Sequence, residues 1–366
     1  MQFSIIGRGV VELLAGILLI ATLSFYGFAA EPESQAGAKP NILLLHSYHD
    51  DMPWSKKFNQ GFQKRGKEAA SGHVQVFTEW LDIARLSDSW NADYLGRQLA
   101  QKYAGKNITV VVSDDLKAAK AFNDYAAKSL PDVTHIYAGT AAHQFTAGDS
   151  VFAAVWLPTV ANYASGIDLI RAAHPDASRI EVLTDAYSAV TKKRLQQLKN
   201  EFAPYKNEIE INFFTEFTID QLVSHVSSLP PDVILLYCLV FEDETGQRFI
   251  PIDVAQKIAA VANAPVYSYW DTLLGSGVFG GAMVSAERTG WNAADLALRL
   301  VAGEKVDFSA INSAGQTGLF FDWGQLKRWG LEEDDFPAQS TFLNRLPSFY
   351  SENTVAVWGT LLFFGL

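Results

Sequence analysis

The chain has 366 residues, a hydrophobic content of 49% and a net charge of -11. This length predicts about two domains of roughly 150 residues each, with enough apolar side chains for a folded core in both. The acidic balance, with no basic stripe along the sequence, argues against a nucleic-acid partner, because phosphates attract clustered Lys and Arg.

Residues 1–30 predict an export signal. Arg8 gives a positive start, and an apolar stretch runs from Leu13 to Ala30 and ends in small residues that are typical of a cleavage site. The apolar length of about 18 residues fits both a cleaved signal peptide and a retained membrane anchor. A polar linker follows at 31–39, so we expect the rest of the chain to lie in the periplasm.

Short apolar runs alternate with helix-period segments from residue 40 to residue 157. Strands are predicted at 41–47, 73–80, 107–113, 133–139 and 151–157, and helices at 55–69, 87–104 and 114–128. This alternation is typical of a parallel sheet that is covered by helices on both faces. We therefore assign 40–157 to a first α/β lobe.

The same alternation restarts near Pro158. Helices are predicted at 160–175, 189–203, 219–230 and 250–263, and strands at 179–185, 209–217 and 232–241. A second doubly wound α/β lobe is therefore expected at 158–264. Residues 265–345 are expected to supply two short crossover strands, a closing helix at 288–303 and a tail that packs on both lobes.

The sequence ends in an almost wholly apolar segment, TVAVWGTLLFFGL at 354–366. A membrane span needs about 20 such residues, so the segment is also compatible with a terminal element that packs on the core. Phe349, Tyr350 and Trp358 lie where aromatic residues anchor a helix at a membrane surface. We interpret 354–366 as the start of a transmembrane helix.

Polar and aromatic side chains follow the predicted strands. Ligands of open parallel sheets bind beyond the carboxyl ends of the strands, so these residues are candidates for a binding cleft. In the first lobe they are Ser47, Tyr48, Trp80, Asp82, Ser113, Asp114, Asp115, Gly139 and Thr140. In the second lobe they are Thr184, Asp185, Ala186, Tyr187, Phe241, Glu242, Tyr269, Trp270 and Asp271. Their hydroxyls, carboxylates and rings suit a small polar molecule with hydroxyl or amine groups.

Two motifs allow a different chemistry. His46 and His49, followed by Asp50 and Asp51, are metal-ligand residue types, but no second cluster completes the three or four ligands that a metal requires. A polar loop with one core histidine explains them as well. The run GSGVFGG at 275–281 spells a dinucleotide fingerprint, yet a strand is predicted after it where the fingerprint requires a helix. No cofactor is therefore predicted.

The triplet of Ser113, Asp114 and Asp115 begins a predicted helix. Ser113 as the helix cap, with two acids in the first turn, explains the triplet without a ligand. The same position follows a strand, where it would line a cleft, and both interpretations stay open. The single cysteine, Cys238, lies in an apolar run and is expected to be a core residue.

The stretch ILLLHSYHDDMPWSKKFNQGF at 42–62 resembles the opening of extracytoplasmic sensor domains of bacterial histidine kinases and diguanylate cyclases. These domains are related to ABC-transporter substrate-binding proteins of the type I periplasmic-binding-protein class. The resemblance continues through SDD at 113–115, TDAYSA at 184–189, YWDTLLGSGVFGG at 269–281 and the tail at 321–345. It implies two lobes that close on a small ligand. The implied ligand-binding residues are Ser47, Tyr48, Trp54, Asp114 and Thr140 in the first lobe, and Asp185, Tyr187, Tyr269 and Asp271 in the second.

The resemblance leaves two roles open. One is a sensor domain that signals through a membrane helix, which the segment 354–366 favours, and the other is a binding component that serves an ABC permease. The expected ligand is small and polar, such as an amino acid, a nucleoside or a sugar-like molecule. A third hypothesis, an extracytoplasmic hydrolase or metal enzyme, requires His49, Asp50 and Asp51 to converge. We expect the chain to be a binding module and not an enzyme.

Overall fold

The computed structural model describes residues 39–69, 74–83, 92–127, 130, 133–139, 153–159, 161–307, 311 and 316–345. Contacts divide the chain into the units Met1–Lys39 and Pro40–Leu366, and the structure described below belongs to the second unit. The predicted export signal, the apolar segment 354–366 and Thr140 lie outside the described residues. Within the described part of the chain, no helix is both long enough and apolar enough to cross a membrane.

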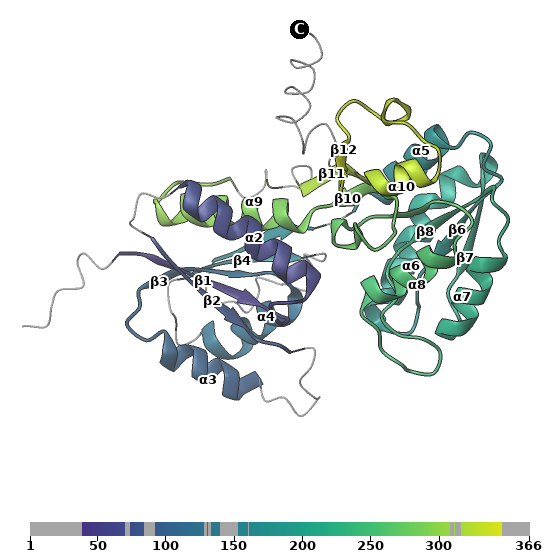
Figure 1. Ribbon diagram of the computed structural model, residues 1–366. Coiled ribbons are helices and arrows are strands. Elements are labelled where there is room, and N and C mark those ends of the chain that lie inside the picture. The colour runs from purple at the N-terminus through teal and green to yellow at the C-terminus, as the bar shows by residue number, and fades with distance from the viewer. Residues whose placement is uncertain are drawn as a thin grey trace, which may run out of the picture. The chain divides into compact units, whose positions relative to one another are not determined.

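The first lobe is built on a five-stranded sheet with the order β2-β1-β3-β4-β5 (Figure 1). Its strands all pair in parallel and are β1 (Asn41–His46), β2 (Gln75–Trp80), β3 (Ile108–Ser113), β4 (Thr134–Gly139) and β5 (Ala153–Pro158). Its helices are α2 (Pro53–Glu68), α3 (Ala92–Lys102), α4 (Leu116–Ala121) with a π-helical turn at Phe122–Ala126, and α9 (Ala286–Val301), which returns from the second lobe.

Strand β1 shows why helices cover both faces of this sheet. Its side chains alternate in direction: Ile42 and Leu44 lie in the core formed with α2 and α9. Leu43 and Leu45 lie in the core formed with α3 and α4. All four side chains are fully buried. An unbroken apolar run is therefore what this central, two-sided strand requires.

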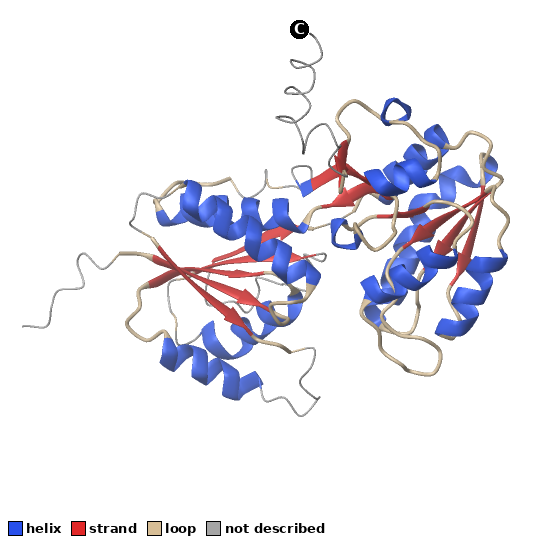
Figure 2. Cartoon of the chain, in the orientation of Figure 1, coloured by secondary structure: helices blue, strands red, loops and turns tan. Residues whose placement is uncertain are grey.

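The second lobe has a seven-stranded sheet with the order β12-β11-β10-β9-β8-β6-β7. Figure 2 draws the strands of both lobes in red and the helices in blue. Its strands are β6 (Arg179–Leu183), β7 (Glu210–Phe214), β8 (Val233–Tyr237), β9 (Val266–Ser268), β10 (Gly280–Val284), β11 (Thr317–Asp322) and β12 (Thr341–Leu343). Its helices are α5 (Tyr163–Ala173), α6 (Ala189–Phe202), α7 (Ile219–Ser228), α8 (Pro251–Val261) and α10 (Trp323–Arg328). The part β7-β6-β8-β9-β10 repeats the strand order of the first lobe. The expected fold of two doubly wound α/β lobes is therefore confirmed.

Residues 265–345 divide between the two lobes. Strands β9 to β12 extend the second sheet, while α9 packs on α2. A Cβ atom on Gly61 would lie 1.9 Å from the backbone oxygen of Glu287, and one on Gly290 would lie 1.9 Å from that of Phe58. These two glycines therefore allow the backbones of α2 and α9 to touch.

The second sheet is not parallel throughout. Strand β11 pairs antiparallel with β10, in a register that places Thr317 opposite Val284. The last residue of β10 thus faces the first residue of β11, so that the chain runs back along β10 when it returns from α9. Strands β11 and β12 follow the predicted closing helix, where no strand was predicted. A two-sided core explains the sequence of β11, since Phe321 and Phe320 lie in different clusters.

The start of α4 corrects the predicted helix cap. The N-cap is Asp115, whose carboxylate accepts a hydrogen bond from the Lys117 N–H at 3.0 Å. Ser113 is instead the last residue of β3, and its hydroxyl lies 2.8 Å from His135 Nε2. The parallel pairing of β3 with β4 extends through Ser113, and this keeps the residue in the sheet. Cys238 is fully buried in the second-lobe core, as predicted.

Candidate functional site

Each sheet reverses its strand order next to its first strand. The reversal lies between β1 and β3 in the first lobe and between β6 and β8 in the second. Crevices at such reversals are the usual ligand sites of open α/β sheets. The loops that follow these four strands therefore define the candidate site.

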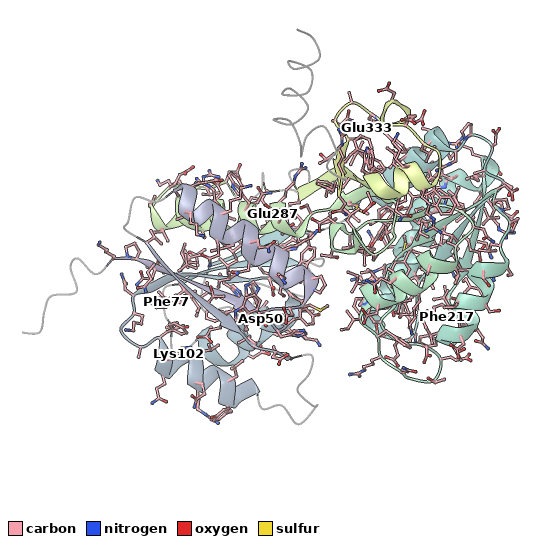
Figure 3. All side chains as sticks on the ribbon, in the orientation of Figure 1. Asp50, Phe77, Lys102, Phe217, Glu287 and Glu333 are labelled. Carbon is pink, nitrogen blue, oxygen red and sulfur yellow. The ribbon has the colours of Figure 1, made fainter. Side chains whose placement is uncertain are left out.

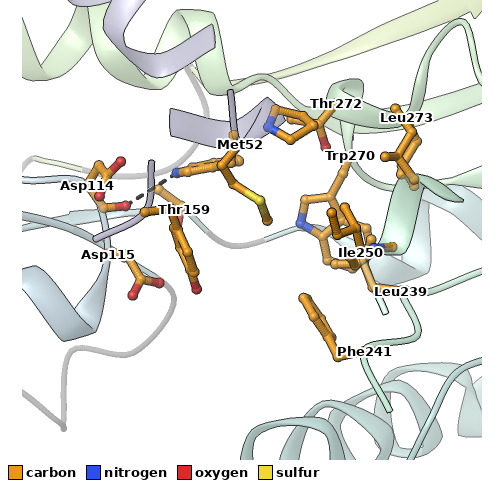
Figure 4. Close-up of a pocket in the computed structure, with 16 residues that line it drawn as sticks. Met52, Asp114, Asp115, Thr159, Leu239, Phe241, Ile250, Trp270, Thr272 and Leu273 are labelled. Carbon is orange, nitrogen blue, oxygen red and sulfur yellow. Dashed lines mark hydrogen bonds between the residues drawn. The ribbon is translucent and has the colours of Figure 1, made fainter. Parts of the chain in front are cut away.

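A cavity of about 160 Å³ lies at the loops after β1, β3 and β8 (Figure 4), and residues 184–188 after β6 do not line it. Its aromatic lining residues are Tyr48, Trp54, Phe241 and Trp270, and its carboxylates are Asp114 and Asp115. Further apolar contacts come from Met52, Pro53, Leu239, Ile250, Pro251 and Leu273. Within the part of the chain that the structure describes, no Lys, Arg or His side chain lines the cavity. A closed cavity of roughly this volume holds a molecule the size of benzene.

Asp114 ties the first-lobe wall together. Its carboxylate accepts hydrogen bonds from the Ser47 N–H at 3.0 Å, the Ser55 hydroxyl at 2.7 Å and His46 Nδ1–H at 2.6 Å. Its backbone oxygen accepts a further bond from Trp54 Nε1–H at 3.3 Å. Asp114 is only 2% exposed. The carboxylate therefore joins the loops after β1 and β3 to the start of α2.

Asp115 stands in a different environment from its neighbour. It is half-buried, and its carboxylate caps α4. Burial raises the pKa of this carboxyl, and the charge of Asp114 adds to the effect, whereas the Lys117 N–H opposes it. Asp115 in turn raises the pKa of the Tyr48 hydroxyl well above its usual value, together with burial and Asp114. This end of the cavity therefore concentrates negative charge in poorly solvated surroundings.

The second-lobe wall is aromatic and is supported from behind. The Arg194 guanidinium lies 5.7 Å from the centre of the Phe241 ring and 5.3 Å from that of Trp270. Its Nη1–H also donates to the backbone oxygen of Cys238 at 3.2 Å. Both distances are those of a cation–π contact. Arg194 itself does not line the cavity.

The same wall contains a strained residue. The backbone of Leu239 has a φ of +65°, a value that residues other than glycine rarely adopt. The Thr184 hydroxyl holds this segment by donating to the backbone oxygen of Leu239 at 3.3 Å, and Asp185 Oδ2 accepts from the Phe241 N–H at 2.7 Å. Backbone strain of this kind clusters at ligand sites. Leu239 therefore supports the assignment of this cavity as the functional site.

Two helix starts also face the cavity. Helix α2 contributes Pro53 and Trp54, and α8 contributes Pro251 and Ile252. Each helix has proline in its first positions and no side-chain cap. Proline carries no N–H, so each start offers one donor fewer than an ordinary helix start would.

Three of the predicted site residues in the first lobe, Tyr48, Trp54 and Asp114, line the cavity. Ser47 does not line it. This residue is fully buried, and its hydroxyl accepts a hydrogen bond from the Ala118 N–H at 2.8 Å. Thr140 lies outside the described residues.

The four predicted site residues in the second lobe do not line the cavity. Asp185 is fully buried and is bonded to the main chain as described above. The Tyr187 hydroxyl accepts from the N–H of Phe217, which Figure 3 labels near α7, at 2.9 Å. The Tyr269 hydroxyl donates to the backbone oxygen of Tyr163 at 2.7 Å. Their ligand contacts stay a prediction, while the structure shows them holding the second-lobe loops.

Asp271, the fourth of these residues, connects the second lobe to α2 and α9. Its carboxylate accepts from the Ser285 hydroxyl at 2.9 Å and the Ala286 N–H at 3.2 Å, at the start of α9. Lys57 Nζ lies 3.6 Å from the Asp271 carboxylate and donates to its backbone oxygen at 2.7 Å. Burial raises the pKa of Asp271, and Lys57 opposes the shift.

Asp115, Phe241 and Trp270 were candidates because they follow strands, but they were not among the residues selected as ligand-binding. Successive residues point in opposite directions where a strand ends, so position alone does not separate them. Tyr269 and Asp271 were selected where Trp270 lines the cavity, and Asp114 was selected without Asp115. The apolar residues 250–252 follow no strand directly. Their only signal is a proline that begins a helix after a polar loop.

The histidine loop has no metal geometry in the structure. His46 is fully buried and stacks on Trp80 with ring centres 4.0 Å apart, so the core histidine is confirmed. His49 Nδ1 lies 3.6 Å from Asp82, while Asp51 pairs with Lys56 at 3.8 Å. Among the residues that the structure describes, no group of three or more His, Cys, Asp or Glu is placed to hold a metal ion.

No protein-family model and no curated protein matches this sequence. The fold is similar to that of a substrate-binding protein with adhesive properties from Clostridium difficile, in a ligand-free, open structure. The identity is 15% and the TM-score 0.62, covering 84% of this chain and 99% of that chain. An ABC domain from Streptococcus pneumoniae in complex with L-Trp matches at 14% identity and a TM-score of 0.55, covering 83% and 99%. A conserved domain protein from Vibrio cholerae matches at 14% identity and a TM-score of 0.54, covering 83% of this chain and 99% of that chain. At these identities the likeness establishes the fold, two lobes of the type I periplasmic-binding-protein kind.

Proposed function

We propose that this chain is an extracytoplasmic binding protein that holds a small amphipathic molecule between its two lobes. The observation that carries the proposal is one cavity at both strand reversals, with Asp115 on one wall and Phe241 and Trp270 on the other. Apolar cavities with a few convergent polar groups are the usual form of small-molecule sites. The substrate-binding protein among its structural neighbours supports the same function.

The carboxylates favour binding over catalysis. Asp114 already accepts three hydrogen bonds from protein groups, so Asp115 is the acid with capacity left for a ligand. A hydrolytic acid–base pair needs two groups that both reach the reacting atoms. His49, Asp50 and Asp51 do not supply a second pair, because Asp50 and Asp51 are exposed and His49 faces Asp82.

The role that we favour is the binding component of an ABC transporter, because one structural neighbour is named a substrate binding protein and another an ABC domain in complex with L-Trp. The second candidate is a sensor domain, which the predicted apolar segment 354–366 supports. A ligand that contacts both walls stabilises the closed arrangement of the lobes in either role. Neighbouring genes separate the two roles: a permease and ATPase pair supports transport, and a kinase or cyclase frame supports sensing.

A thermal-shift screen of the purified protein tests the binding function. The compounds are amino acids, amines, nucleosides and sugars, and aromatic members receive priority because the pneumococcal neighbour holds L-Trp. A ligand of the cavity should lose its shift in Trp270→Ala. Trp323→Ala is the matched control, since Trp323 lies on α10 and does not line the cavity. A confirmed ligand whose shift survives both Trp270→Ala and Phe241→Ala would remove the cavity from the proposal.

A further inference from the structure

Resting on the binding function proposed above, we propose that the ligand is an organic cation, an amine without a carboxylate and with an aromatic or apolar body. Its charged group lies at Asp115, and its body lies against Phe241 and Trp270. This assigns the chemical class of the ligand and its direction in the cavity.

The charged side chains that line the cavity favour a cationic ligand. Asp114 and Asp115 are the charged residues among the described lining residues, and both are acidic. Asp114 is 2% exposed and already accepts hydrogen bonds from three protein donors. The Asp115 carboxylate accepts from the Lys117 N–H and the Ser47 side chain, and it remains half-buried at the cavity. An ionised carboxylate has about four acceptor sites, so Asp115 keeps capacity for a ligand donor. An ammonium group at this point gains a charge-assisted hydrogen bond where water screens it little.

The basic side chains near the cavity determine which way a cationic ligand would lie in it. Lys117 lies 5.9 Å from the centre of the Tyr48 ring, and its charge lowers the pKa of Asp115, but its side chain is exposed and water screens it. Lys57 is paired with Asp271. Arg194 lies behind the aromatic wall. A ligand cation at that wall would be repelled by the guanidinium, whereas an electron-rich ring would not. Arg194 therefore directs the body of the ligand to the rings and its ammonium group to Asp115.

The N-terminal ends of α2 and α8 would favour a negatively charged ligand group, which is the opposite of the charge assigned here. Helix starts attract anions through free N–H groups and the helix dipole. Here Pro53 and Pro251 remove a donor from each start. A carboxylate would also lie beside two acidic side chains and meet no cationic side chain of the described lining. The balance therefore favours the cation.

Four probes of similar shape test the class by isothermal titration of the purified protein at pH 7. They are phenethylamine, the neutral 2-phenylethanol, the anionic 3-phenylpropionate, and phenylalanine, which adds a carboxylate to the same amine. Phenethylamine should bind about tenfold tighter than 2-phenylethanol, as one charge-assisted hydrogen bond predicts. Tighter binding of 3-phenylpropionate or phenylalanine than of phenethylamine would show that the helix starts dominate, and would overturn the assignment.

Substitution of Asp115 tests the position of the charge. Asp115→Asn and Asp115→Ser both keep a good helix cap and remove the carboxylate. Either variant should weaken phenethylamine about tenfold or more and leave 2-phenylethanol within about threefold. Asp50→Asn, which removes an exposed charge from the loop after β1, should leave both affinities unchanged. Unchanged phenethylamine affinity in both Asp115 variants would contradict the assignment.

The two proposals fail in different ways. If a neutral, anionic or zwitterionic compound binds best and Trp270→Ala abolishes its binding, the binding function stands and the cation assignment is wrong. If neither these probes nor the wider screen gives binding that depends on Trp270, both are wrong.

Discussion

The two walls of the cavity are built on the same scaffold and carry different chemistry. In each lobe a buried aspartate after a central strand accepts a hydrogen bond from the N–H of the neighbouring loop across the strand reversal. Asp114 does so with Ser47 at 3.0 Å, and Asp185 does so with Phe241 at 2.7 Å. The first wall then presents Asp115, whereas the second presents Phe241 and Trp270 (Figure 4). Arg194 contacts both of these rings.

This difference separates residues that hold the walls from residues that meet a ligand. Both tying aspartates are buried and occupied by protein donors, so we expect them to act on stability first. Asp115 and Trp270 are half-buried at the cavity, so we expect them to act on affinity first. The predictions below test this division.

The largest expected effect is that of Asp114→Ala on stability. The change leaves His46, Ser55 and the Ser47 N–H without their buried acceptor. Each buried donor left without an acceptor costs about 1–3 kcal/mol of unfolding free energy, and this variant leaves three. Urea denaturation measures the loss. A loss below about 1 kcal/mol would mean that water replaces the carboxylate and that the first wall does not depend on it.

Trp270→Ala should act on affinity and follows in size. A truncated aromatic residue at the centre of a binding site costs about 2–4 kcal/mol of binding free energy. Titration of the best ligand from the screen measures the effect, and urea denaturation of the same variant separates it from stability. If stability falls and affinity does not, Trp270 belongs with the residues that hold the wall.

The fold was largely predictable from the sequence because its signals are local. The short apolar run ILLL at 42–45 in β1 is typical of a strand covered on both faces. The antiparallel edge formed by β11 was not predictable, since the pairing partner of a strand depends on where the chain returns after α9. The cap of α4 was missed because the extent of β3 is fixed by its pairing with β4 and not by the residues themselves.

The candidate site was predictable as a region and less so as residues. The carboxyl ends of the strands identify the right loops. They do not identify which of two adjacent residues turns toward the cavity, and so Tyr269, which bonds to Tyr163, was selected in place of Trp270. The buried acids show the same limit, because a carboxylate that binds a ligand and one that binds the main chain are alike in sequence.

Asp185→Ala should destabilise the second wall less than Asp114→Ala destabilises the first. It leaves the buried Phe241 N–H unpaired, which costs about 1–3 kcal/mol. Asp185→Asn is the matched control, since its amide oxygen can still accept that bond and should restore much of the stability. If Asp185→Asn folds like the parent protein but loses ligand affinity, then Asp185 contacts the ligand directly and the division between the walls fails.

The smallest expected effect concerns the charge of Asp115 without ligand. Its pKa is raised above the ordinary value, first by burial and then by Asp114, so ionisation is less favourable in the folded protein than in the unfolded chain. The stability from this group is therefore fully present below the ordinary pKa and is lost as the pH rises through the raised pKa.

Asp115→Asn removes the ionisation and keeps the cap of α4. Urea denaturation should find the variant more stable than the parent protein at pH 7, with the difference shrinking toward pH 4. A parent protein that is the more stable one at pH 7 would mean that the first wall gains from its charge even without a ligand.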